Sequence, residues 1–256
     1  MMRNVSAVAR NTFREAVRDR VLYLFVGFAA LVLVGSKLFG LLTVGDEAKV
    51  ILDLGLAGIQ FATMLIAVFM SLILIGREIE RQTVVTVLSK PVRRWEFLVG
   101  KYAGLVAVVL VNLVAMAVLL VLLAWAYGGR WVPMVFLGAA MTLVEMLVLS
   151  AFAVLFSVVT RPMLGSIMTL AVFVVGHLTQ DLWMLTRHLS GAIAGWLIPA
   201  VYYALPNLER FNFKTEIVHG LQIPWTAVVW AVVYGCAYAT LVLVIACRRF
   251  ERKDLV

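Results

Sequence analysis

Glu145 is the residue whose type and position most suggest chemistry, because it stands near the middle of a long apolar run. If that run crosses a membrane, an acidic side chain at its centre costs roughly 2.5–3.5 kcal/mol on insertion scales. Glu145 is therefore expected to face protein or water rather than lipid. Two interpretations stay open, namely a group on a transport pathway or coupled to protons, and a structural hydrogen bond between helices. Gln60 and Asn112, in other apolar runs, are the expected partners and the further pathway candidates.

Other reactive side chains have spacings that do not build a site. His177 and Asp181 stand four residues apart, but two ligands do not make a metal site, so we expect no metal and a hydrogen bond at the outer interface. Ser166 and His177 are eleven residues apart in one run, roughly 16 Å along a helix, so they cannot act as nucleophile and base. A His-Glu-x-x-His motif is absent from the sequence. No catalytic residue is predicted, and an intramembrane enzyme is the weakest of the functional alternatives.

The apolar runs that hold these residues predict an all-α integral membrane protein. Hydrophobic residues make up 64% of the 256-residue chain, whereas a soluble domain is about half apolar. The runs reach the roughly twenty residues that a membrane-spanning helix needs, and none shows the alternation of a barrel strand. Six transmembrane helices are predicted, at 21–43, 54–75, 102–127, 132–159, 162–180 and 224–247. Because six is an even number, both termini are expected on one side of the membrane.

The distribution of positive charge predicts which side faces the cytoplasm. Sixteen of the 22 Lys and Arg residues fall on the side that holds the termini, segment 76–101 and the turn at 160–161. Positive residues stay in the cytoplasm, so we expect both termini inside. The net charge of +8 is then a property of that face rather than of a nucleic-acid-binding domain.

Residues 4–20 predict an amphipathic helix ahead of the first span. Arg10, Arg14 and Arg18 repeat every four residues on one face, while Phe13 falls on another, apolar face. A basic amphipathic helix next to a span tends to lie in the plane of the membrane interface, against lipid. The alternative is a plain positive anchor for the first span.

Segment 181–223 is expected to form short helices on, or re-entering, the outer leaflet. It is too apolar for a loose loop and too often interrupted by Gly and Pro for another span. Aromatic residues such as Trp183 and Trp196 suit the headgroup level. No separate soluble domain is visible, so residues 1–256 are read as a single membrane domain.

Segment 76–101 is much longer than a turn between two helices needs. Its apolar centre, TVVTVL, is bracketed by charged residues, and Pro91 prevents one continuous helix through it. A short helix followed by a new helix from about Pro91 into the third span is the expected arrangement. Composition leaves open whether the short helix docks on a protein or rests on the membrane. Gly100 and Gly104 further predict a close helix crossing.

A family resemblance favours docking. The run from Glu78 to Thr83, then Leu88-Ser-Lys-Pro91, Arg94, Glu96 and Gly100-Lys101, resembles the cytoplasmic signature of type-two ATP-binding-cassette (ABC) permeases. FREAVRDR is similar to the interfacial elbow helix of that family, and RRFERKDL to its usual ending. YALPNLERFNF resembles the subgroup with the permeases of nitrous-oxide-reductase maturation and gliding motility. Gln82 departs from the pattern, in which Gly is common.

The resemblance implies that the chain is a non-enzymatic permease subunit of an ABC exporter in a prokaryotic inner membrane, with a coupling helix that docks on a separate ATPase. It implies two ATPase copies carrying ATP and Mg and a second permease copy or paralogue. It is also compatible with an extracytoplasmic accessory protein as a further partner. The sequence holds no Gly-x-x-x-x-Gly-Lys-Ser/Thr phosphate loop, and no cofactor is expected in the chain itself. An ATP-driven mechanical role on a partner protein is the main alternative. The implied coupling residues are Glu78, Glu80, Arg81, Thr83, Leu88, Lys90, Pro91, Arg93 and Arg94.

Overall fold

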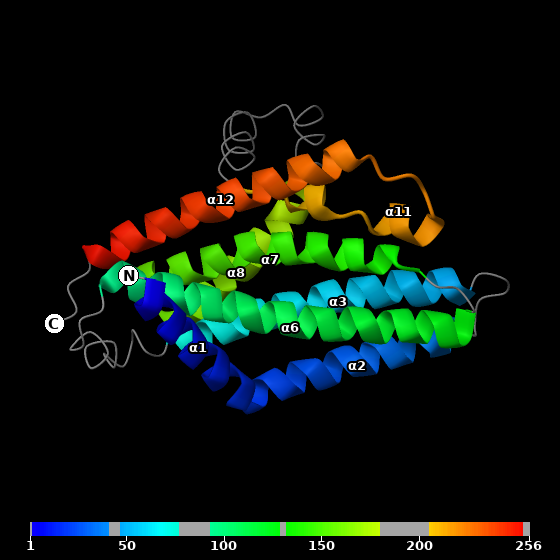
Figure 1. Cartoon of the computed structure of the whole chain (residues 1–256), viewed down its shortest axis with the longest axis horizontal. Helices are drawn as coiled ribbons and strands as arrows, with labels where there is room; N and C mark the ends of the chain where they lie inside the picture. The colour runs from blue at the N-terminus through cyan, green and yellow to red at the C-terminus, as the bar shows by residue number, and fades with distance from the viewer. Residues whose placement is uncertain (1, 41–46, 77–92, 129–131, 180–204, 253–256) are drawn as a thin grey trace, which may run out of the picture.

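The computed structural model describes residues 2–40, 47–76, 93–128, 132–179 and 205–252, which form a bundle of long helices (Figure 1). No strand occurs in these ranges. The predicted coupling residues from Glu78 to Pro91, and residues 181–204 of the outer segment, lie outside the described residues. The elements are α1 (Met2–Arg18), α2 (Arg20–Gly40), α3 (Glu47–Ser71), the π-helical turn η1 (Leu72–Gly76), α6 (Arg94–Gly128), α7 (Met134–Val159), α8 (Pro162–His177), the 3-10 turn η2 (Leu208–Phe211), α11 (Lys214–His219) and α12 (Trp225–Glu251).

Four helices of the described part are long and apolar enough to cross a bilayer: Lys49–Ile75, Arg94–Ala126, Met134–Val159 and Trp225–Glu251. They correspond to the second, third, fourth and sixth predicted spans. Helix α8 has 16 residues, about 24 Å of rise against a hydrocarbon core of about 30 Å. Within α2 the apolar stretch found is Val26–Gly35. The all-helical, membrane-spanning architecture is therefore supported, while the count of six crossings stays a prediction.

Helix α6 extends beyond the apolar run from which the third span was predicted. It begins at Arg94, eight residues before the apolar run that starts at 102 and close to the start near Pro91 expected for this helix, and it continues unbroken for 35 residues. Helix α3 likewise begins at Glu47 rather than at 54. Hydropathy marks where a helix enters hydrocarbon, whereas backbone hydrogen bonding continues into the polar flanks, which explains both differences.

Proline sets the start of three helices. Pro162 is the first residue of α8, where a missing N–H leaves no helical hydrogen bond unmade. Pro133 and Pro224 immediately precede α7 and α12. At the other end of a helix, Gly220 stops α11 in the left-handed conformation with φ of 66°.

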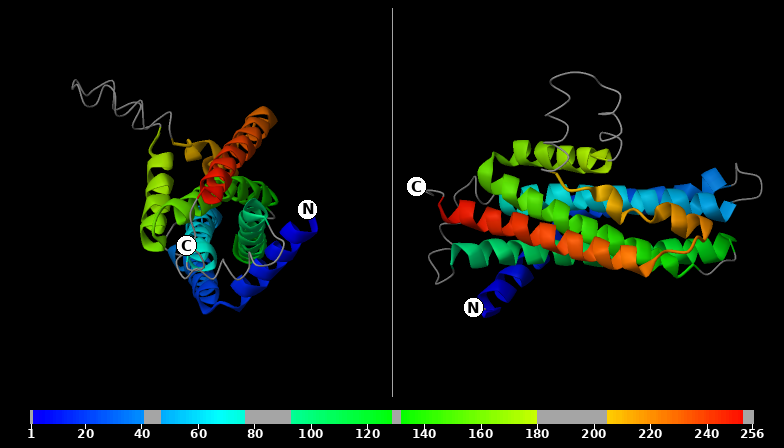
Figure 2. Two further views of the ribbon diagram at one scale, coloured as in Figure 1. Left: turned by 90° about the vertical axis from the view of Figure 1, so that its left-hand side faces the viewer. Right: turned by 90° about the horizontal axis from the view of Figure 1, so that it is seen from above.

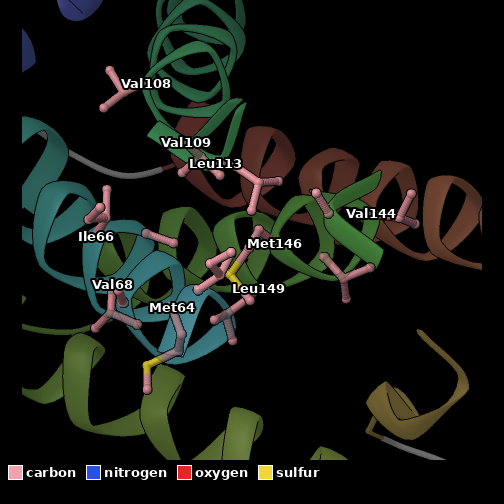
Figure 3. Packing of buried hydrophobic residues seen from close by; sticks show 14 of the residues in the cluster. Met64, Ile66, Val68, Val108, Val109, Leu113, Val144, Met146 and Leu149 are labelled. Atoms are coloured by element: carbon pink, nitrogen blue, oxygen red, sulfur yellow. The ribbon is translucent and has the colours of Figure 1, made fainter. Parts of the chain in front are cut away.

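The core of the bundle lies between α3, α6 and α7. Figure 3 shows Met64, Ile66 and Val68 of α3, Val108, Val109 and Leu113 of α6, and Val144, Met146 and Leu149 of α7 packed together. Helix α12 also lies along α7, and α8 packs against another side of α7 (Figure 2). At the α7–α12 crossing, a Cβ added to Gly235 would lie 2.4 Å from Val144 Cγ1, so glycine permits this close approach. Helix α7 is thus surrounded by protein along much of its length.

Helix α1 packs across the first half of α6, and only Asp19 separates it from α2 (Figure 1). Thr12 and Ala16 are fully buried. Phe13 packs against the core, while Arg10, Arg14 and Arg18 are exposed. The amphipathic helix expected for 4–20 is therefore present, and its apolar face is covered by α6 of the same chain.

The described part of the outer segment contains the two short elements η2 and α11. Helix α11 lies against α3 and α7, whereas η2 contacts α7, α8 and α12. Figure 1 shows α11 at one end of the bundle, whereas α1, the start of α6 and the end of α12 lie toward the other end. We refer to these as the α11 end and the α1 end.

Candidate functional site

The first candidate site is the junction of α1, α6 and α12 at the α1 end. Glu96, in the first turn of α6, is buried, and its Oε2 accepts hydrogen bonds from the Arg93 backbone N–H (3.1 Å) and from Asn4 Nδ2 (3.2 Å). The first bond caps the start of α6, where unpaired N–H groups favour a negative charge. The second bond joins α6 to α1.

Arg94 connects the start of α6 to the end of α12. Its Nη1 donates to the main-chain oxygens of Glu251 (3.2 Å) and Phe250 (3.5 Å), where helix α12 leaves carbonyls unpaired and favours a positive charge. Beneath this contact, the buried rings of Phe97 and Phe250 stack with their centroids 6.1 Å apart. Arg94 was predicted as an ATPase contact, which stays a prediction; the structure shows that it binds the end of α12 in its own chain.

Two glycines allow α1 to press against α6. A Cβ on Gly100 would lie 2.6 Å from Val8 Cβ, and a Cβ on Gly104 would lie 2.6 Å from Thr12 Cβ and 2.8 Å from the Ala9 oxygen. No real side chain tolerates contacts this short without a shift of the helices. The close crossing predicted from these glycines is confirmed, and the crossing helix is α1.

Lys101 adds an ionic contact to the same crossing. Its Nζ lies 3.5 Å from Glu15 Oε2 of α1 and 5.8 Å from the centre of the Phe97 ring. The Lys101 side chain is buried, whereas Glu15 is about half exposed. The amine of Lys101 therefore lies against α1.

The geometry of the junction indicates what it can transmit. Residues 77–92 connect η1 to α6, and the predicted coupling residues that the structure describes are Arg93 and Arg94. Arg93 is exposed, while Arg94 reaches α12. A displacement applied at the start of α6 would therefore act on α1 through Asn4 and Lys101 and on α12 through Arg94.

The second candidate site is a polar cluster inside the bundle. Gln60 Nε2 of α3 donates to Glu145 Oε2 of α7 at 2.9 Å and lies 3.1 Å from His177 Nε2 of α8. His177 Nε2 is 3.4 Å from Glu145 Oε1, and His177 Nδ1 is 2.9 Å from the Phe173 oxygen. Glu145 is 1% exposed. Three helices thus bring one carboxyl, one amide and one imidazole together.

Sequence reasoning found part of this cluster. Gln60 is a partner of Glu145, as expected, whereas Asn112 donates to the Val108 oxygen of its own helix at 2.9 Å. His177 was missed as a partner of Glu145. The available signal was a titratable residue near the end of an apolar run, but a run does not reveal which helix its face meets.

A small cavity borders the cluster toward the α11 end. Its volume is about 20 Å³; Gln60, Thr142 and Glu145 line it on the bundle side, and Phe211, Asn212 and Lys214 cover it. Lys214 Nζ binds Asp53 Oδ1 of α3 at 3.1 Å. The Asn207 N–H donates to the Tyr234 hydroxyl at 3.0 Å. We call residues 207–219, which include η2 and α11, the outer cover.

The remaining chemical candidates do not assemble into a site. Ser166 Oγ donates to the Pro162 oxygen at 3.2 Å, in its own helix, and not to His177. Within the ranges that the structure describes, no three His, Cys, Asp or Glu side chains are grouped to hold a metal ion. Asp181, the other residue of the weighed metal pair, lies outside those ranges.

Comparison with known proteins places these features in a family context. The model of the family described as "ABC-2 family transporter protein" matches residues 6–255. No curated protein matches the chain.

Proposed function

Because the chain belongs to the ABC-2 family of transporter proteins, and is thus a multi-pass permease subunit of an ABC transporter, we propose that it couples export to ATP hydrolysis by a separate ATPase subunit. The observation that carries the proposal is that the family match spans nearly the whole chain, on a bundle with four membrane-length helices. Permeases of this family work in general with an ABC ATPase. The chain itself is the non-catalytic membrane subunit.

Segment 78–94 is the proposed coupling helix, docked in a cleft of the ATPase. The arrangement around it supports this role. It connects two membrane-length helices, α3 and α6, and it leads directly into the α1–α6–α12 junction. Through the bonds of Arg94 to α12 and of Glu96 to α1, movement of this segment would reach three helices at once.

The proposed assembly contains two ATPases and a second permease copy or paralogue, because six spans form half of the usual complex. We place it in a prokaryotic inner membrane with the α1 end in the cytoplasm, since that end carries the excess of Lys and Arg. The start of α1 and the end of α12 share this end, as an even number of crossings requires (Figure 1). The nitrous-oxide-maturation and gliding-type subgroup is the proposed place within the family, on the motif that ends at Phe213.

The proposal is tested by purifying the tagged chain from its own host in mild detergent and identifying the co-purifying proteins by mass spectrometry. An ATPase that carries a phosphate loop is expected to accompany the chain. Arg93→Glu should remove it, because Arg93 is exposed beside the coupling segment and its charge reversal leaves the Arg94 contact intact. Gln222→Glu, exposed at the α11 end, is the control and should retain the ATPase.

The same complex in lipid discs distinguishes export from mechanical work. A compound that stimulates ATP hydrolysis identifies an exported substrate class. An ATPase that co-purifies but responds only to a protein partner supports the mechanical role instead. Absence of any ATPase under these conditions contradicts the coupling proposal.

A further inference from the structure

We propose that Glu145, Gln60 and His177 form an intramembrane site that binds one exchangeable proton, reached from the α11 end through the cavity beneath the outer cover. ATP-driven export does not require such a site, so this inference goes beyond the proposed function. The three side chains come from α7, α3 and α8, and each lies within 3.4 Å of the other two. A carboxyl group buried at this depth must be paired or protonated.

The hydrogen bonds around His177 determine where its hydrogen lies. The Phe173 carbonyl can only accept, so His177 Nδ1 carries a hydrogen and donates it. The Gln60 amide nitrogen can only donate, and its two hydrogens fit Glu145 Oε2 at 2.9 Å and His177 Nε2 at 3.1 Å. His177 Nε2 then accepts, which makes the ring neutral in this arrangement.

One atom of the cluster remains unsatisfied in that arrangement. Glu145 Oε1 is buried and has no hydrogen-bond partner, and it faces His177 Nε2 at 3.4 Å. An orphaned buried acceptor costs about 1–3 kcal/mol. One added proton, either on Oε1 or on His177 Nε2, lets these two atoms share a hydrogen bond and removes the deficit, once the Gln60 hydrogen leaves the single lone pair of Nε2. In the second position an imidazolium pairs with a carboxylate, and the Gln60 amide turns so that its oxygen faces the ring.

The cavity provides the route for the proton. Its volume of about 20 Å³ has room for one water molecule. Gln60 and Glu145 form its inner wall, and Asn212 and Lys214 of the outer cover form its outer wall. Within the outer cover, α11 lies at the α11 end, away from the α1–α6–α12 junction (Figure 1). A water in this position exchanges protons with Glu145 without crossing the apolar core between α3, α6 and α7.

His177 is the basic partner of Glu145, because the nearby Lys214 and Arg210 interact with other side chains. Lys214 is paired with Asp53, and the Arg210 guanidinium lies over the Tyr234 ring, 5.1 Å from its centre. Glu209 of η2 is close enough to interact electrostatically with Glu145. Helix α6 contributes Tyr102, whose hydroxyl donates to the Leu147 oxygen at 3.1 Å, α12 also contributes Tyr238, and η1 contains no titratable residue.

Infrared difference spectroscopy of the full-length chain in lipid discs, without ATPase, tests the proposal across a pH series. The wild type should show a carboxylic-acid carbonyl band that titrates and that shifts in heavy water. Glu145→Gln should remove this band, whereas Glu209→Gln, at the neighbouring carboxyl, should retain it. A spectrum identical for wild type and Glu145→Gln at every pH, or a Glu145 band that never exchanges with heavy water, would overturn the site.

A second variant keeps the test informative if Glu145→Gln folds poorly. His177→Gln retains a hydrogen-bonding side chain but cannot hold the proton. The proton concentration at which the Glu145 band is half titrated should therefore change by about tenfold or more. An unchanged midpoint would contradict proton sharing with His177. Because no ATPase is present, a negative result leaves the permease assignment untouched.

Discussion

The guanidinium of Arg94, the first residue of α6, donates a 3.2 Å hydrogen bond to the main-chain oxygen of Glu251, the last residue of α12. These residues are 157 positions apart, and their contact fixes the end of α12 to the start of α6. Arg94 also directly follows the proposed coupling segment. One side chain therefore links that segment to a helix far away in the sequence.

Neutralising Arg94 should uncouple that link, whereas neutralising its neighbour should not. Arg94→Gln removes a charged hydrogen bond at the end of α12 and is expected to lower the free energy of unfolding by about 1 kcal/mol. Arg93→Gln, at an exposed side chain, should leave stability unchanged. Thermal unfolding in detergent, followed by tryptophan fluorescence, measures both. Equal melting temperatures for the two variants would show that the Arg94 contact does not stabilise the junction.

The α1–α6 crossing should not tolerate an added methyl group. Gly100→Ala and Gly104→Ala each place a Cβ 2.6 Å from a Cβ of α1, and overpacking of this kind costs about 1–3 kcal/mol. Gly27→Ala is the matched control, because its Cβ would meet nothing within 4 Å. Since alanine favours helix over glycine by about 1 kcal/mol, the control should be neutral or stabilising. Denaturation of all three in one detergent makes the comparison, and similar losses would argue against a close crossing.

Breaking the Lys214–Asp53 ion pair should loosen the outer cover with little loss of global stability. Both side chains are partly exposed, so Asp53→Asn is expected to cost less than about 1 kcal/mol. Local opening should rise by up to about fivefold, the factor that corresponds to 1 kcal/mol. The readout is the maleimide labelling rate of Ile217→Cys, a buried position of α11, with Cys236 and Cys247 replaced by Ser. Glu216→Gln on the same helix is the control and should leave the labelling rate unchanged. Equal labelling rates with and without Asp53→Asn would show that the ion pair does not hold the outer cover in place.

The proposed orientation predicts opposite labelling of the two ends. With the native cysteines replaced, His219→Cys at the α11 end should react with a membrane-impermeant maleimide on intact cells. Arg93→Cys at the α1 end should react only after the membrane is opened. Both positions are exposed, so access across the membrane decides the result. Reaction of Arg93→Cys on intact cells would place the coupling segment outside, where no ATP is supplied.

The class of this protein could be predicted from its hydropathy and its local sequence motifs. Apolar runs longer than twenty residues predict membrane-spanning helices without knowledge of their neighbours, and four of the six predicted runs are membrane-length helices in the described part. The motif residues between Glu78 and Lys101 pointed to the ABC permeases, and the family match confirms that assignment. These properties follow from each segment alone, because burial in lipid and helix formation are local requirements.

Apart from the Gln60–Glu145 pair, tertiary structure alone decided the partners of the polar side chains. Arg94 reaches Glu251, Lys101 reaches Glu15, and His177 joins Glu145 and Gln60. Each contact depends on which faces of two helices meet, and the hydrophobic periodicity of a membrane helix is too weak to specify this when lipid and protein are equally apolar. The sequence by itself therefore determined that the chain is a helical membrane permease. The packing of α1, α8 and α12 determined which groups its polar and charged side chains contact.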